Sequence, residues 1–262
     1  MKMLGLTRAY NEKPIFLVTE DLEILNEIMK DEIPTNMASY LSSLFIYLHK
    51  RLAFHLENFE LSDNYYLDIA ENLAKKSEDE IHSLYNLFII YKLKEDYSEA
   101  EKTITDLIEK SNKEKYIYEK ASLLKHLGKW GAALQLYNEI LQKNPKNEEA
   151  WEDMGDILVS KEKYEDAAIA YLKSLELDKE NKELWFKHGI CLKKMDRWGG
   201  ALQSFENVIK LDESYEEAYE FLLTILEQRK MYDKMLFYLN KLKKLGVDVD
   251  DKIAKIKKRN KK

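Results

Sequence analysis

The fold is decided by the stretch KNEEAWEDMGDILVSKEKYEDAAIAYLKSLELD (residues 146–178). Apolar residues fall at helical spacing twice within it, first around Trp151 and Leu158 and then around Tyr164 and Tyr171. A polar turn at residues 160–163 separates the two series. The stretch therefore predicts two amphipathic helices that fold back on one another as a hairpin.

This hairpin repeats along the chain with a period of 34 residues. Four columns show the repeat: Trp151 recurs as Trp185, Gly155 as Gly189, Ala167 as Ala201, and Tyr171 as Phe205. One hairpin cannot bury its own apolar face, so it needs a copy on each side. A fixed period of this length is typical of a stacked helix–turn–helix array. The small residues in the glycine and alanine columns are expected where the backbones of the two helices approach each other.

The pattern of Trp151, Gly155 and Leu158, followed by Tyr164, Ala167 and Tyr171, resembles the tetratricopeptide repeat. The resemblance implies an all-α fold, a right-handed superhelical solenoid of stacked antiparallel helical hairpins. It also implies that the chain is a repeat protein acting as a scaffold for protein–protein interaction.

The register of the period predicts the organisation of the chain. Three well-matched repeats are expected at 114–147, 148–181 and 182–215, flanked by weaker ones at 81–113 and 216–249. Residues 1–80 form a helical cap or extension, or a divergent hairpin, and 250–262 form a C-terminal solvating helix with a basic tail. Asn147 and Asn181 are predicted N-caps, while Ser111 and Ser214 have the spacing of capping boxes.

Composition and motifs argue against several classes of function. No catalytic or phosphate-binding motif occurs, and the five histidines are scattered, so we expect no enzyme activity, no cofactor and no metal site. Cys191 is the single cysteine and cannot form an intrachain disulfide, which suits a reducing cytoplasm. The longest apolar run is too short to cross a bilayer and no signal peptide is evident, so we expect no membrane association and a cytoplasmic location.

The resemblance also places particular side chains in a partner-binding groove, because the first helix of each repeat lines the concave surface in this family. The predicted groove residues are Tyr85, Ile89, Tyr118, Lys125, Glu149, Glu152, Asp153, Asp156, Phe186, Ile190 and Lys193. Four of them are carboxylates on one strip of one helix, where like charges repel one another. A cationic ligand would relieve this repulsion. The apolar members either anchor a ligand or pack between repeats.

We therefore expect a non-enzymatic protein–protein interaction module that binds another protein or a peptide segment, basic and partly apolar. The alternative is a nucleic-acid-associated accessory protein that uses the basic tail: Lys252, Lys255, Lys257, Lys258, Arg259, Lys261 and Lys262. The net charge of −6 disfavours this alternative, because the rest of the chain is more acidic still. The sequence leaves open the partner's identity and the oligomeric state.

Overall fold

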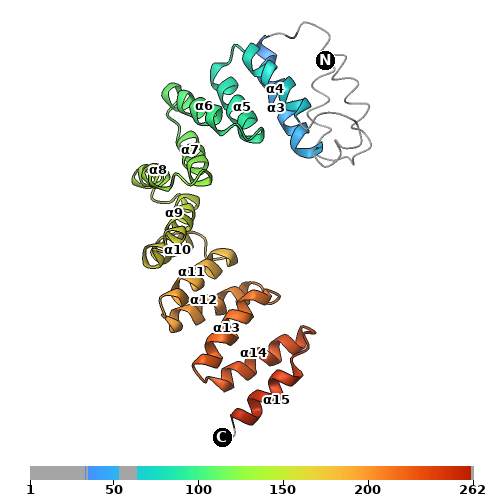
Figure 1. Ribbon diagram of the computed structural model, residues 1–262, viewed down its shortest axis with the longest axis vertical. Coiled ribbons are helices and arrows are strands. Elements are labelled where there is room, and N and C mark those ends of the chain that lie inside the picture. The colour runs from blue at the N-terminus through green and yellow to red at the C-terminus, as the bar shows by residue number, and fades with distance from the viewer. Residues whose placement is uncertain (1–32, 34, 53–63, 261–262) are drawn as a thin grey trace. The chain divides into compact units, whose positions relative to one another are not determined.

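The computed structural model describes residues 33, 35–52 and 64–260. Within those ranges every regular element is an α-helix (Figure 1). The predicted all-α class of stacked helical hairpins is confirmed. A helix expected from Thr19 to Ile33 lies almost wholly outside the described residues. The chain forms two compact units, which follow one another in sequence at Asn112 and Lys113.

The first unit contains four described helices: α3 (Thr35–Leu52), α4 (Tyr65–Lys76), α5 (Glu80–Leu93) and α6 (Tyr97–Lys110). α3 packs along α4, and α5 packs along α6. Phe45, Leu67 and Leu73 are among the buried residues that join α3 and α4. The hydroxyl of Ser42 donates to the carbonyl of Ala70 at 2.8 Å, so the interface of α3 and α4 also contains a polar link.

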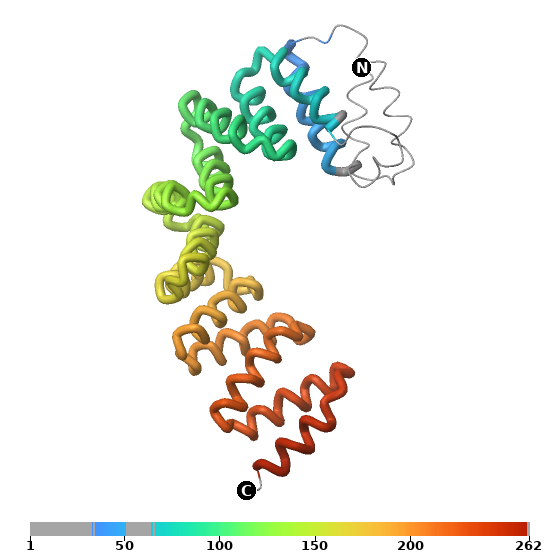
Figure 2. The backbone as a smooth tube through the Cα atoms, in the orientation of Figure 1, coloured from blue at the N-terminus to red at the C-terminus, as the bar shows by residue number. Residues whose placement is uncertain are grey.

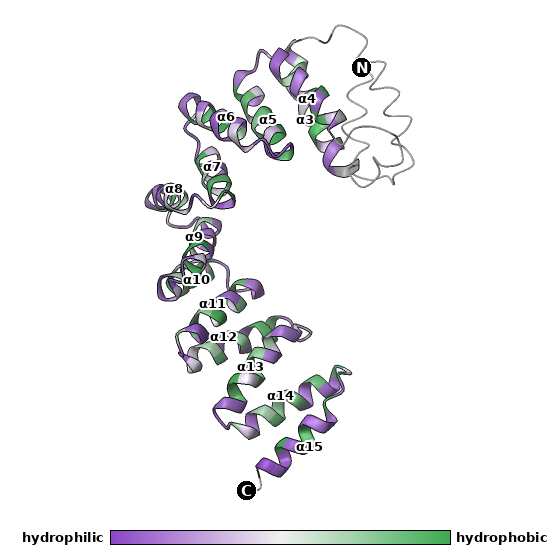
Figure 3. Ribbon diagram, viewed as in Figure 1, coloured by the Kyte–Doolittle hydropathy of each residue, from purple (hydrophilic) through white to green (hydrophobic). Residues whose placement is uncertain are grey.

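The second unit contains four helical hairpins and a terminal helix, which follow one another along the stack (Figure 2). The hairpins are α7 (Glu114–His126) with α8 (Trp130–Lys143), α9 (Glu148–Ser160) with α10 (Tyr164–Leu177), α11 (Lys182–Lys194) with α12 (Trp198–Leu211), and α13 (Glu216–Gln228) with α14 (Tyr232–Lys244). The terminal helix is α15 (Asp250–Arg259). It is mostly hydrophilic (Figure 3), but Ile253 and Ile256 are buried. Each hairpin therefore buries its apolar face against its neighbours in the stack.

The turn inside each hairpin of this unit contains one residue in the left-handed region. These residues are Gly128 (φ 69°), Glu162 (φ 58°), Asp196 (φ 56°) and Lys230 (φ 55°). A left-handed residue after a helix C-terminus allows backbone bonds to the last free carbonyls, and glycine adopts it without strain. Only one of the four turns uses glycine. In the other three turns, the packing of the two helices holds Glu162, Asp196 and Lys230 in a left-handed conformation that these residue types do not favour.

The two glycines of the glycine column have a different role from the one the sequence suggested. A Cβ atom added to Gly189 would lie 2.9 Å from the ring of Phe205, and one added to Gly155 would collide with the ring of Tyr171. The expectation that Gly155 marks a close approach of two backbones is wrong. The glycine of the first helix instead makes room for an aromatic ring from the second helix.

Two of the four predicted helix starts are capped as expected. The side chain of Asn147 accepts from the Ala150 N–H at 2.9 Å, and that of Asn181 caps α11 in the same way. The predicted capping boxes at Ser111 and Ser214 are wrong, because α7 and α13 begin without a side-chain cap. The hydroxyl of Ser214 donates to Asp212 at 2.7 Å, so it serves the turn between repeats.

His188 of α11 is buried beside Ser204 of α12, with 2.9 Å between Nδ1 and Oγ. The Ser204 hydroxyl donates to the carbonyl of Gly200, so the histidine Nδ1–H donates to Ser204 Oγ. Burial lowers the pKa of His188 to about 4. The folded protein therefore holds this imidazole neutral where the unfolded chain, with a histidine pKa near ~6.5, binds a proton.

Acidification should destabilise the protein through His188. Because the folded pKa is the lower one, stability is full above pH ~6.5 and is lost as the pH falls toward the folded value. Between pH 7 and pH 5 we expect a loss of about 2 kcal/mol that the His188→Gln variant does not show. Urea unfolding of both proteins at pH 7 and at pH 5 measures this loss of unfolding free energy. Equal pH dependence in the two proteins would mean that the folded state accepts the proton.

Candidate functional site

The four carboxylates predicted on one strip all lie on α9. Glu149, Glu152, Asp153 and Asp156 are three or four residues apart, so they share one side of the helix. Glu149 is exposed, whereas the other three are partly buried. The neighbouring hairpins therefore decide what these three carboxylates contact.

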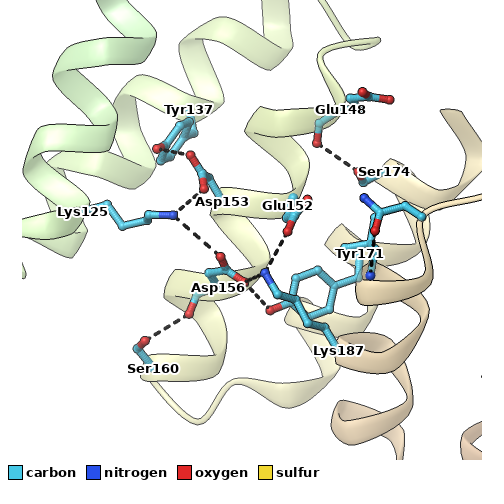
Figure 4. A network of polar contacts seen from close by, with 12 residues as sticks. Lys125, Tyr137, Glu148, Glu152, Asp153, Asp156, Ser160, Tyr171, Ser174 and Lys187 are labelled. Carbon is cyan, nitrogen blue, oxygen red and sulfur yellow. Dashed lines mark hydrogen bonds and ion pairs between the residues drawn. The ribbon is translucent and has the colours of Figure 1, made fainter. Parts of the chain in front are cut away.

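Asp153 is the centre of a polar network that joins two hairpins (Figure 4). Its carboxylate accepts a hydrogen bond from the Lys125 ammonium of α7. It also accepts from the hydroxyl of Tyr118 at 2.8 Å and from the hydroxyl of Tyr137 at 2.6 Å. The side chain of Asp153 is only 13% exposed. Three donors therefore compensate the loss of water around this carboxylate.

Asp156 and Glu152 extend the network to the next hairpin. The Lys187 ammonium of α11 donates to Asp156 and to Glu152, each at 2.8 Å. The hydroxyl of Tyr171 donates to Asp156 at 2.8 Å, and the Lys125 ammonium lies 3.7 Å from its other oxygen. One continuous set of contacts, which we call the α9 network, thus connects α7, α9 and α11.

The protonation states follow from burial and from these contacts. Burial and the adjacent carboxylates raise the pKa of Tyr118, Tyr137 and Tyr171 far above the ordinary tyrosine value, so all three hydroxyls remain donors. Burial works against the charge of Lys187, but its hydrogen bonds to Asp156 and Glu152 outweigh that effect and raise its pKa. The three tyrosines are therefore neutral donors and Lys187 is a cation at neutral pH.

The expectation of an unrelieved cluster of like charge is wrong for three of the four carboxylates. Lys125 and Lys187 pair with Glu152, Asp153 and Asp156, so the protein supplies the cations itself. Three carboxylates still face only two ammonium groups. Glu149 adds a further negative charge beside Tyr118, at an open pocket of about 270 Å³ that Glu114, Lys115 and Asn147 also line. The surface of α9 stays acidic, with its exposed charge at Glu149.

The predicted groove residues of α11 lie among aromatic rings and the core. The ring of Phe186 contacts those of Tyr215, Phe221 and Phe205, with centroids 5.3, 5.6 and 5.7 Å away. Packing between repeats is thus the observed role of Phe186. Ile190 also packs against the buried core, and the Lys193 ammonium lies 4.5 Å from the centre of the Phe221 ring. This half-buried patch borders the acidic surface of α9.

Tyr85 and Ile89, the remaining predicted groove residues, lie on α5 and belong to the first unit. Tyr85 is half-buried, and its ring centroid is 6.4 Å from that of Phe88. Ile89 packs against the core cluster formed by α3, α4 and α5. Both are therefore packing residues of that unit.

The described residues contain neither a metal-binding cluster nor a membrane-spanning helix. No group of three or more histidine, cysteine, aspartate or glutamate side chains is arranged there to hold a metal ion. None of the helices described is both long and apolar enough to cross a membrane.

The family model described as "Tetratricopeptide repeat" matches residues 118–182, from α7 to the start of α11. The chain contains tetratricopeptide repeats. The α9 network lies almost entirely within the matched tetratricopeptide segment. Comparison with curated protein sequences finds no match to this chain.

Solved structures of a tetratricopeptide protein share the fold. A "Crystal structure of MamA protein" is 15% identical and superposes with a TM-score of 0.56, covering 62% of this chain and 88% of that one. MamA from Desulfovibrio magneticus RS-1 is 14% identical, with a TM-score of 0.56, covering 66% of this chain and 98% of that one. At this level of identity the likeness concerns the fold.

Tyr137 and Tyr171 belong to the site but were not among the predicted site residues. Lys187 was expected on the same concave surface, but its ion pairs with α9 were not predicted. Lys187 occupies the column of Asp153, 34 residues later. Its ion pairs are nevertheless with Glu152 and Asp156 and not with Asp153, so the column relation indicates a lysine near the α9 carboxylates without giving its partners. The two tyrosines come from second helices, and their hydroxyls donate to Asp153 and Asp156 on the first helix α9. The ring of Tyr171 lies against Gly155.

Proposed function

We propose that the tetratricopeptide unit beginning at Lys113 is a non-enzymatic protein-interaction module. Its binding surface is formed by the first helices α7, α9 and α11, and it takes a basic, partly apolar segment of a partner protein. The observation that carries the proposal is the α9 network, which holds these helices in register while leaving the surface acidic. A surface fixed before binding loses little entropy when a ligand arrives.

The residues of this surface divide into two groups. Asp153, Asp156 and Lys187 maintain the surface, whereas Glu149 is exposed and can meet a cation on the ligand. Tyr118 lies next to Glu149 and presents part of its ring to the same pocket. We expect the ligand's apolar side chain there and its basic side chain at Glu149. A cytoplasmic location belongs to the proposal, since the single cysteine is free.

The nucleic-acid alternative finds less support. The basic side chains Lys252, Lys255 and Arg259 line a cleft together with glutamates of α13, and Arg259 forms an ion pair with Glu227 at 2.6 Å. Phosphates approaching this part of α15 would meet carboxylates as well as cations.

Binding of a basic peptide should depend on Glu149. The probe is an N-acetylated, C-amidated peptide of alternating lysine with leucine and phenylalanine, labelled for fluorescence anisotropy. We expect Glu149→Lys to weaken its binding about two- to fivefold at low salt, since exposed ion pairs are worth ~0.2–1 kcal/mol. Added salt should reduce the difference.

The matched control is Glu180→Lys, which reverses an exposed charge in the turn between α10 and α11. It should leave the affinity unchanged. Equal binding by both variants and the unaltered chain, or better binding of a glutamate-containing counterpart, would refute the proposed surface.

A further inference from the structure

The second unit ends in a cleft of about 500 Å³ between α13 and α15. Both helices are labelled in Figure 1. The volume lies within the range of protein sites that bind small ligands or short peptide segments, roughly 300–1,000 Å³. The cleft is separate from the α9 network and shares none of its residues.

The cleft exists because α15 packs against α14 rather than against α13. Ile253 and Ile256 are its buried side chains, and α15 packs along α14. Near its end, Arg259 reaches Glu227 of α13. α15 thus rests on α14 while the space between α13 and α15 remains open. The apolar floor of that space is formed by Leu223, Met235, Leu242 and Ile256.

The two walls of the cleft carry opposite charges. Glu216 and Glu220 line it from α13, and Lys252 and Lys255 line it from α15. In the described part of the chain no ion pair within 4.0 Å involves any of these four residues. Glu227 and Arg259 also line the cleft but pair with each other, and Asp248 lines it from the loop before α15. Two carboxylates of α13 and two ammonium groups of α15 therefore face the apolar floor outside any ion pair of the described residues.

Tyr219 adds an unpaired polar group beside the same cleft. The residue lines the cleft and is 1% exposed. Its hydroxyl has no hydrogen-bond partner among the described residues. In the two preceding repeats the residue of this column is a tryptophan, Trp151 or Trp185, whose indole N–H donates to a backbone carbonyl. A buried donor without an acceptor is unfavourable, and a bound segment with a carbonyl group offers one.

We infer that the cleft between α13 and α15 binds a short segment of a partner protein in which an apolar side chain separates basic from acidic residues. The apolar side chain rests on the floor, the basic residues face Glu216 and Glu220, and the acidic residues face Lys252 and Lys255. A segment of one charge sign would be attracted by one wall and repelled by the other. Complementary charge on both walls sets the orientation of the segment.

Three labelled peptides test this inference by fluorescence anisotropy with the full chain. All are N-acetylated and C-amidated, so that their ends carry no charge. The mixed peptide is Lys-Lys-Leu-Phe-Glu-Glu, and its counterparts replace both glutamates by lysine or both lysines by glutamate. Because the α9 surface also takes lysine-rich peptides, the three peptides are compared in the chain carrying Glu149→Lys, where we expect the mixed peptide to bind most tightly. The double variant Glu216→Lys/Glu220→Lys should bind it roughly 4- to 25-fold more weakly, from about two- to fivefold per charge.

The same double variant should prefer the all-acidic peptide, because both walls are then basic. The matched control on α13 is Glu217→Lys, which reverses an exposed charge that does not line the cleft. On α15 the control is Lys257→Glu, which is also outside the cleft. Both controls should bind the mixed peptide as the unaltered chain does.

Equal affinity for the three peptides, or no change in the double variant, would overturn the inference. A shift of oligomeric state in light scattering, without an effect on peptide binding, would also overturn it by assigning the cleft to a second copy of the chain. The Glu149→Lys variant should keep the preference for the mixed peptide over its two counterparts, because Glu149 does not line the cleft. The Glu149→Lys variant thus tests the proposed α9 surface, and the Glu216→Lys/Glu220→Lys variant tests the cleft independently of it.

Discussion

Replacing Asp153 by alanine should lower the free energy of unfolding by about 2–4 kcal/mol. The substitution leaves the Tyr118 and Tyr137 hydroxyls and the Lys125 ammonium without their common acceptor. Breaking a buried ion pair by removing one partner typically costs about 3–5 kcal/mol. We expect less here because the Lys125 side chain is 28% exposed and can regain water.

Glu149→Ala is the matched control, since it removes a carboxylate from the same strip of α9 that has no ion pair in the described part of the chain. It should change stability by no more than about 0.5 kcal/mol. Urea unfolding of both variants measures the difference. A double-mutant cycle with Lys125→Ala should give a coupling of at least about 0.5 kcal/mol. Equal stabilities of the two single variants would show that the α9 network contributes nothing to folding.

The second large effect is expected at Gly155. In Gly155→Ala the new methyl group collides with the ring of Tyr171, which is itself buried and cannot turn away. Moving the ring also draws its hydroxyl from Asp156, so overpacking and a lost hydrogen bond act together. Overpacking of this kind costs about 1–3 kcal/mol.

The control is Gly199→Ala in the first turn of α12, where a Cβ atom would meet nothing within 4 Å. Alanine there should be neutral or stabilise by up to about 1 kcal/mol, because glycine is a poor helix former. Thermal and urea unfolding of the two variants should therefore move in opposite directions. A stabilising effect at Gly155 would mean that the ring of Tyr171 is not held where the structure places it.

The repeat pattern made the fold readable from the sequence. Trp151, Gly155 and Tyr171 recur at a fixed interval, and only a stack of hairpins gives such columns equivalent surroundings. The caps at Asn147 and Asn181 were also readable, because a cap depends on residues within one turn. The failed cap at Ser214 shows the limit of local reasoning, since Asp212 competes for the hydroxyl.

The contacts of the candidate site were harder to predict. The four carboxylates of α9 could be placed on one strip, but whether they meet solvent or lysines depends on the distance between hairpins. Lys125 precedes Asp153 by 28 residues, so no spacing within one helix predicts this ion pair. Lys187 is one full period from Asp153, and that relation was available in the sequence. Lys187 pairs with Glu152 and Asp156 rather than with its column equivalent Asp153, so a comparison of charges column by column brings a lysine next to α9 but predicts neither its partners nor the tyrosine donors.

The α9 network has a consequence for how the stack comes apart. In an array each hairpin touches only its neighbours, so unfolding can enter from an end and advance one hairpin at a time. Lys125 and Lys187 attach α7 and α11 to the same carboxylate cluster on α9, at Asp156, so the loss of either neighbouring hairpin leaves that charge partly unpaired. The three hairpins from α7 to α12 are thereby coupled into a single cooperative block. Unfolding that begins at α15 would therefore be opposed most strongly when it reaches α12, the last helix of this block.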